Sequence, residues 1–201
     1  MQMTSKPFSA ASARNREPIL AALRDLLRGC QTVLEIGSGT GQHAVHFGAA
    51  MPHLLWQTSD LASNHAAIRA WLDGAALPNV LPPLLLDVAT DDWPAGPFDA
   101  VYTANTCHIM SWPQVQSMFR GIGRVLAPGG VLCIYGPFKR GGQFTTPSNA
   151  QFDASLRAQA PHMGLRNLED VDALARAQGL TQVADLALPA NNDLLAWQRP
   201  G

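Results

Sequence analysis

The stretch that decides the fold is Val33-Leu34-Glu35-Ile36-Gly37-Ser38-Gly39-Thr40-Gly41-Gln42-His43. It begins as an apolar strand, passes through three glycines at alternate positions, and enters a short helix. Glycine permits a tight turn and lets a ligand approach bare backbone, and a helix N-terminus offers free N–H groups. Ligands of open α/β sheets bind at this carboxyl edge, where the strand order reverses. The stretch therefore predicts an α/β fold with a ligand site at the glycine turn.

Strand-like and helix-like segments alternate along the rest of the chain. Predicted strands cover about 32–36, 54–58, 84–86, 98–103 and 131–135, and predicted helices cover about 15–28, 64–74, 115–126, 149–159 and 168–178. Apolar strands separated by helices predict a parallel sheet covered on both faces. Two closing strands, at 181–188 and 193–198, form a hairpin that adds antiparallel pairing at one edge. We predict one doubly wound, Rossmann-like domain over residues 1–201, in which residues 1–14 form an N-terminal arm that can cover a cofactor.

Composition excludes several classes of protein. A length of 201 residues favours one domain, and a formal net charge of −1 argues against a nucleic-acid binder. No apolar run approaches the roughly 20 residues of a membrane span, and the N-terminus does not resemble a signal peptide. Cys30, Cys107 and Cys133 are far apart in the sequence, so we expect reduced, mostly buried thiols and a cytoplasmic protein. The sequence gives no indication of the oligomeric state.

The glycine spacing separates two classes of cofactor. A dinucleotide fingerprint, G-x-G-x-x-G, needs glycine at position 42, where this chain has Gln42. The pattern here is an acid followed by alternating glycines: Glu35, Gly37, Gly39 and Gly41. A carboxylate at the strand end suits a cationic cofactor and would repel a pyrophosphate. The pattern resembles the first motif of class I methyltransferases, which bind S-adenosylmethionine.

Two further acids close the next two predicted strands. Asp60 ends the second strand, where an acid can accept hydrogen bonds from both ribose hydroxyls. Asp87 closes the third, and the resemblance implies that its carboxylate meets the adenine amine while the backbone N–H of Val88 faces a ring nitrogen. Each acid alone could be a solvated loop residue or a helix cap. Acids at three consecutive strand ends favour the cofactor site.

The fourth predicted strand ends in Ala104-Asn105-Thr106-Cys107-His108, which resembles the A-N-x-x-H pattern of class I enzymes that act on small molecules. The resemblance implies that the Asn105 carbonyl accepts from the cofactor ammonium and that this strand end lies beside the transferred methyl. His108 is then positioned like a general base. A structural His108 that caps the loop is the competing interpretation, and Cys107 is interpreted as packed.

Four segments together resemble one family of small methyltransferase-like proteins catalogued as a domain of unknown function. They are 12–19, 105–109, Tyr135-Gly136-Pro137-Phe138 and Pro189-Ala190-Asn191-Asn192. The resemblance covers nearly the whole chain. It implies the seven-stranded methyltransferase sheet, mostly parallel, with a reversed strand in the C-terminal hairpin and helices on both faces. It supplies no substrate.

The family-like segments add predicted site residues. Arg14 can pair with the methionine carboxylate of the cofactor, and Asn15 lies beside it; a surface ion pair and a helix cap are the alternatives. The predicted substrate pocket is lined by Tyr135, Phe138, Phe144 and Asn149. Asn149 can equally cap a helix. His43 and His46 lie three residues apart, but no third ligand is near in sequence, so no metal site is predicted.

These residues predict a methyltransferase that uses S-adenosylmethionine on a small-molecule acceptor, with no nucleic-acid or membrane partner. Methyl transfer is then an in-line displacement in a water-poor pocket, where positioning does most of the catalysis. One alternative is a protein of the same fold that binds the cofactor, or a partner, without transferring methyl. Another is an NAD-linked oxidoreductase, which Gln42 and Glu35 disfavour.

Overall fold

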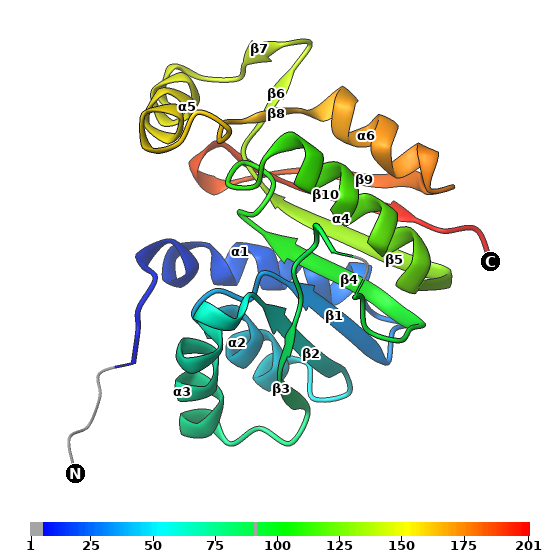
Figure 1. The fold of residues 1–201 in the computed structure, drawn as a ribbon. Coiled ribbons are helices and arrows are strands. Elements are labelled where there is room, and N and C mark those ends of the chain that lie inside the picture. Colours follow the sequence, from blue (N-terminus) through cyan, green and yellow to red (C-terminus); the bar gives the residue numbers. More distant parts are fainter. Residues whose placement is uncertain (1–5, 91) are drawn as a thin grey trace.

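A seven-stranded sheet runs through the centre of the computed structural model, which describes residues 6–90 and 92–201 (Figure 1). Its strands are β1 (Thr32–Ile36), β2 (Leu55–Asp60), β3 (Val80–Leu85), β4 (Phe98–Ala104), β5 (Leu126–Gly136), β9 (Thr181–Leu188) and β10 (Asn192–Gln198). They lie in the order β3-β2-β1-β4-β5-β10-β9. β10 is antiparallel to both neighbours, whereas the other neighbouring strands pair in parallel. The predicted mostly parallel sheet with one reversed strand is therefore confirmed.

Helices cover both faces of the sheet, as predicted. One face packs against α1 (Ala10–Leu26), α2 (Gln42–Ala50) and α3 (His65–Ala75), and the other against α4 (Trp112–Val125) and α6 (Leu168–Ala177). The rings of Phe47, Trp56 and Tyr102 meet on the first face, with centroids 5.6–5.7 Å apart. On the second face, Phe119 and Trp197 are edge to face at 6.5 Å. Such aromatic pairs add to the free energy gained by burying apolar surface.

The glycine turn follows β1, beside the point where the strand order reverses between β1 and β4. Gly37, Gly39 and Gly41 have φ angles of +71°, +59° and +86°. L-residues with side chains rarely adopt this conformation, so the alternating glycines are a backbone requirement. The backbone N–H groups of Gly37 and Ser38 both donate to the Ser59 carbonyl at 3.0 Å, which fastens the turn to the end of β2. The turn that the sequence predicts is present.

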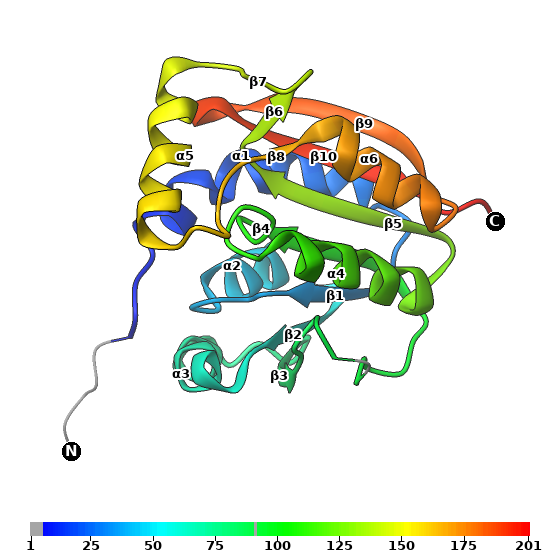
Figure 2. The ribbon, with the colours of Figure 1, turned by 45° about the horizontal axis from the view of Figure 1, so that its top comes forward.

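A second layer of structure lies beyond the carboxyl ends of the parallel strands. It contains α5 (Pro147–Gln159) and a small sheet of β6 (Phe138–Arg140), β7 (Gln143–Phe144) and β8 (Arg166–Asn167). Figures 1 and 2 both place α5 at the end of the sheet toward which β4 and β5 point. The sequence predicts only a long loop at 136–148, because strands of two or three residues leave no hydrophobic period.

The first helix begins earlier than predicted. Ser9 is its N-cap and accepts a hydrogen bond from the backbone N–H of Ser12 at 3.2 Å, so α1 starts at Ala10. Residues 10–14, predicted as part of a flexible arm, are therefore helical, and residues 1–5 lie outside the described residues. Pro18, which the predicted start near residue 15 would put in the first turn, lies inside the helix. Its missing N–H leaves the helix one hydrogen bond short, which is why the sequence pattern suggested a later start.

Two findings bear on the predicted class of protein. Within the described part of the chain, no helix combines the length and apolarity that crossing a membrane requires. Cys30, Cys107 and Cys133 are free and buried, as predicted. Burial raises the pKa of Cys107 to about 12, so this thiol stays protonated at neutral pH and does not act as a nucleophile.

Candidate functional site

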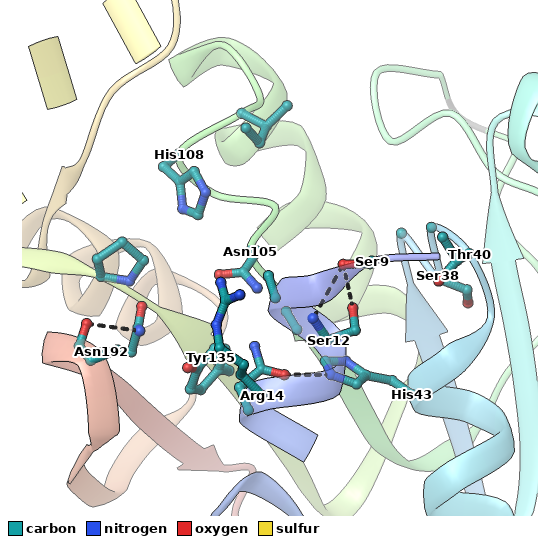
Figure 3. Close-up of a pocket in the computed structure, with 18 of the residues that line it drawn as sticks. Ser9, Ser12, Arg14, Ser38, Thr40, His43, Asn105, His108, Tyr135 and Asn192 are labelled. Carbon is teal, nitrogen blue, oxygen red and sulfur yellow. Dashed lines mark hydrogen bonds between the residues drawn. The ribbon is translucent and has the colours of Figure 1, made fainter. Parts of the chain in front are cut away.

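A cleft of about 1160 Å³ opens at the carboxyl ends of β1, β4 and β5. We call one end the glycine half, lined by Glu35, Gly37, Ser38, Gly39 and Thr40. We call the other end the amide half, lined by Asn105, His108, Tyr135, Asn149, Phe152 and Asn192. The start of α1 runs between them, so that Ser12 lies toward the glycine half and Arg14 toward Tyr135 and Asn105 (Figure 3).

Glu35 is a buried carboxyl group in the glycine half, with 2% of its surface exposed. Its Oε2 accepts hydrogen bonds from Ser38 Oγ at 2.9 Å and Trp56 Nε1 at 3.0 Å. Burial outweighs these two bonds and raises the pKa of Glu35 to about 7. A cation in the cleft would favour the ionised form, so this carboxylate can hold a cationic group.

Asp60 ends β2 beside the glycine turn. Its Oδ2 accepts from the Gly39 backbone N–H at 2.7 Å, and its Oδ1 accepts from Leu61 N at 2.7 Å and Asn64 Nδ2 at 2.9 Å. These bonds fix the carboxylate against Gly39 of the glycine half, although Asp60 itself is not among the residues that line the cleft. Carboxylate oxygens accept more than one hydrogen bond each, so ligand hydroxyls can still donate to Asp60.

The other residues predicted for the adenine end lie away from the cleft lining. Asp87 Oδ1 accepts from the backbone N–H of Ala89 at 2.9 Å and closes a turn after β3. Val88 packs in the core with 5% exposure, and Gly41 faces Ile68 on α3. Asp87, Val88 and Gly41 thus have local roles in the backbone and core, and their predicted contacts with the cofactor stay a prediction.

A buried polar chain connects α1 to the sheet beneath the cleft. Asn15 Oδ1 lies 2.8 Å from His43 Nε2, and His43 Nδ1 lies 3.3 Å from the Tyr102 hydroxyl. Burial lowers the pKa of His43 to about 4, so the ring is neutral and donates on one side while it accepts on the other. The sequence missed this role, because nothing local connects positions so far apart. Across residues 6–90 and 92–201, no three His, Cys, Asp or Glu side chains gather to hold a metal ion.

Arg14 brings a positive charge to the boundary between the two halves. It is exposed and lines the cleft. Among the described residues it has neither a hydrogen-bond nor an ion-pair partner for its side chain, so neither the predicted surface ion pair nor a cap is formed there. A guanidinium in this state can bind a carboxylate through two parallel hydrogen bonds.

His108 and Asn105 lie in the loop after β4. Asn105 has a φ of +59° and its N–H donates to the Tyr135 carbonyl at 2.8 Å. The His108 ring lies edge-on to Phe152 at 5.3 Å and makes no hydrogen bond to the described part of the protein. Burial, and secondarily the charge of Arg166, lowers the pKa of His108 to about 4. The ring is therefore neutral at pH 7 and faces the cleft as an acceptor for a proton or a hydrogen bond.

Arg166 braces the loop that carries His108. Its guanidinium donates to the carbonyls of Cys107 and His162, each at 2.9 Å, and to that of Met110. The Gly164 N–H also donates to the His108 carbonyl at 2.9 Å. The sequence missed Arg166, because the signal lies in contacts between distant segments.

Replacing Arg166 by lysine should loosen this loop, because an ammonium cannot span three carbonyls as a planar guanidinium does. We expect the free energy of unfolding to fall by about 1–2 kcal/mol, as for lost hydrogen bonds to a charged group. The pKa of His108 should rise toward 6.5 as water reaches the ring, which an NMR titration of its ring protons measures. Arg120→Lys, at an exposed site on α4, is the control. An unchanged His108 titration would contradict the brace.

Two of the four residues predicted for the substrate pocket lie away from this cleft. Tyr135 and Asn149 line the cleft, but Phe138 is 1% exposed in the core beneath α4 and α6. Phe144 lies on β7 with 40% exposure, under the Lys139 ammonium at 5.6 Å. The short β6–β7 hairpin, which the sequence did not predict, turns both phenylalanines away from the cleft. Nor does Asn149 cap α5, since Thr146 does so.

Solved structures of methyltransferases share this fold over nearly the whole chain. An O-methyltransferase family protein from Burkholderia thailandensis matches 95% of this chain with a TM-score of 0.84 and 19% identity, over 58% of its own length. The S-adenosylmethionine-dependent methyltransferase SibL in its apo form matches 96% of this chain with a TM-score of 0.81 and 26% identity, over 56% of its own length. Human N-acetylserotonin methyltransferase in complex with SAM matches 95% of this chain with a TM-score of 0.81 and 14% identity, over 53% of its own length. The chain thus spans little more than half the length of these proteins.

The sequence also matches one protein family over most of its length. The family is described as a protein of unknown function (DUF938), and the match covers residues 6–199. The expected resemblance to S-adenosylmethionine-dependent methyltransferases is confirmed by the shared fold. The chain belongs to the DUF938 family and has the fold of class I methyltransferases.

Proposed function

We propose that the protein is an S-adenosylmethionine-dependent methyltransferase that acts on a small molecule. The observation that carries the proposal is a pair of complementary charges in one cleft: the buried Glu35 in the glycine half and the unpartnered Arg14 at its boundary. The cofactor is cationic at its ammonium and sulfonium and anionic at its carboxylate. Glu35 would hold the cationic end, and Arg14 the carboxylate. The fold is one in which human N-acetylserotonin methyltransferase holds SAM.

The glycine half fits this cofactor in shape as well as charge. A Cβ atom built on Gly39 would have no neighbour within 4 Å, so this backbone faces open space in the cleft. Asp60, fixed beside Gly39, would accept hydrogen bonds from the ribose hydroxyls. Asn105 lines the cleft opposite, and its carbonyl would accept from the ammonium. Asp87 and Val88, at the turn after β3, are proposed to contact the adenine, although neither lines the cleft.

When bound, the cofactor would supply a methyl group already activated for transfer. The residues of the amide half would then orient the acceptor and exclude water. The His108 ring, neutral at pH 7 and without a hydrogen bond to the described chain, would take the proton that the acceptor loses. Its edge contact with Phe152 holds the ring in place for this step.

Calorimetric titration with S-adenosylmethionine and S-adenosylhomocysteine tests the proposal. We expect binding in the micromolar range to protein freed of cofactor. Asp60→Asn should weaken it about tenfold, since a loss near 1.4 kcal/mol corresponds to one hydrogen bond to a charged acceptor. Gly39→Val should abolish it by filling the open space, whereas Asp25→Asn, on the surface of α1, should have no effect.

Other results would contradict the proposal. If the protein bound neither compound, or bound NAD alone, the proposal would be overturned. A panel of acceptors, with cofactor consumption as readout, separates methyl transfer from binding without transfer. Binding with no consumption by any acceptor would support the non-catalytic alternative.

A further inference from the structure

Asn149 in the amide half has a fixed orientation that bears on what this half can bind. The side chain is 5% exposed and lines the cleft. Its Nδ2 donates to Thr145 Oγ1 at 2.9 Å and to the Asn191 carbonyl at 3.1 Å, so both amide hydrogens are used. Its Oδ1 has no hydrogen-bond partner anywhere in residues 6–90 and 92–201. The polar atom that Asn149 leaves for the cleft is therefore a carbonyl oxygen.

Asn192 has a similar arrangement next to Asn191, whose carbonyl accepts from Asn149. Its Nδ2 donates to the carbonyls of Ala190 at 3.1 Å and Pro189 at 3.4 Å, and a dashed line in Figure 3 marks a hydrogen bond at Asn192. The described residues offer no donor to its Oδ1. Two amides from different elements, α5 and β10, thus present oxygens to one space.

The rest of the amide half adds uncharged hydrogen-bonding groups, among them the Tyr135 hydroxyl and the Asn105 amide, but no charged side chain. The His108 ring is neutral at pH 7 and its nitrogens are unpaired within the described chain. Phe152, Pro137 and Pro189 supply apolar surface to the same walls. None of the described residues that line this half is an acid, a lysine or an arginine; Arg14 lies at its boundary. An acceptor oxygen in the cleft favours a ligand that donates, and an anion would meet the Asn149 oxygen with no charged side chain of this half to offset its lost water.

We propose that the amide half binds an uncharged molecule that has an apolar face and donates hydrogen bonds through hydroxyl or amide groups. A carboxylate or phosphate should bind there more weakly, because no charged side chain of this half offsets its charge. The inference rests on the proposed function at one point: there Arg14 binds the carboxylate of the cofactor, so that its charge is not available to the molecule in the amide half. A site built around a hydrogen bond rejects analogues that lack the matching group far more strongly than an apolar pocket does.

Matched pairs of small ring compounds test this selectivity. Benzamide and catechol carry donors, whereas benzoate and phenyl phosphate are anions of similar size. With the protein saturated with S-adenosylhomocysteine, ligand-observed NMR should give benzamide and catechol at least tenfold tighter binding than the two anions. Asn149→Leu should weaken benzamide and catechol about tenfold, because it removes the oxygen and keeps the volume.

Asn79→Leu is the matched control for the loss of two hydrogen bonds from a side-chain amide. Asn79 Nδ2 also donates to two carbonyls, those of Gly48 and Leu54, each at 3.0 Å, but it lies outside the cleft lining. It should lower stability as Asn149→Leu does and leave ligand binding unchanged. Equal binding losses in the two variants would overturn the inference.

The remaining outcomes are equally decisive. If no probe binds, the inference is wrong. It is also wrong if the anions bind best and Arg14→Ala abolishes their binding, and the acceptor is then anionic. The same series is run without S-adenosylhomocysteine. If that compound does not bind but the donor preference and its dependence on Asn149 persist, the proposed function fails while the site stands.

Discussion

Replacing Gly41 by alanine should lower the free energy of unfolding by about 2–3 kcal/mol. Gly41 precedes α2 with a φ of +86°, a conformation that costs an L-residue roughly 1–2 kcal/mol. A Cβ atom there would also stand 3.1 Å from Ile68 Cα and 3.2 Å from its carbonyl oxygen. Backbone atoms cannot move aside without pushing α2 away from α3, which adds to the cost. Chemical denaturation of wild type and variant measures the difference.

Two other glycines separate backbone strain from the close contact. Gly179 has a φ of +74° and Gly39 a φ of +59°, and a Cβ atom on either would have no neighbour within 4 Å. Gly179→Ala and Gly39→Ala should therefore cost only about 1 kcal/mol each, which is the strain alone. If Gly41→Ala cost no more than Gly179→Ala, the contact with Ile68 would be of no consequence. Gly39→Ala should in addition weaken cofactor binding, since Gly39 lines the cleft.

The sequence predicts the sheet well because its signals are local. Apolar runs such as 131–135 are bounded by glycine or proline, and a strand buried on both faces needs little else to be recognised. The glycine turn is equally legible, since positive φ angles at alternate positions require that residue type. The start of α1 was misplaced because Pro18 suggested a first turn, whereas Ser9 caps the helix further back.

The candidate site was less predictable, because its side chains are oriented by distant partners. Phe138 and Phe144 follow β5 in the sequence as pocket residues would, but the β6–β7 hairpin turns them toward the core and the solvent. Arg166 meets the His108 loop through three backbone carbonyls, which no sequence pattern records. Residue type indicated the chemistry of the cleft, and only tertiary contacts determine which atoms face it.

Glu35→Gln should stabilise the protein without ligand. The pKa of Glu35 is about 7 in the fold, against 4.5 for an unperturbed glutamate, so the folded state binds this proton more tightly. The stability linked to that proton is fully present below pH 4.5 and is lost as the pH rises through 7. At pH 8 the free energy of unfolding of Glu35→Gln should therefore exceed that of wild type by about 3 kcal/mol, and at pH 4.5 the two values should differ little. Glu17→Gln, at an exposed site on α1, should change neither value.

The same substitution should weaken cofactor binding, which makes the two effects opposite in sign. Only ionised Glu35 attracts the ammonium of S-adenosylhomocysteine, so wild-type affinity should fall about tenfold from pH 8 to pH 6. The rings of His43 and His108, whose pKa values are about 4, stay neutral throughout that range. Glu35→Gln should bind roughly 10- to 100-fold more weakly at pH 8, as for a lost hydrogen bond to a charged group, and without the pH dependence. A flat wild-type profile would mean that Glu35 does not meet the ammonium. A stabilised variant that binds poorly would instead show that this buried acid lowers stability in order to hold a cation.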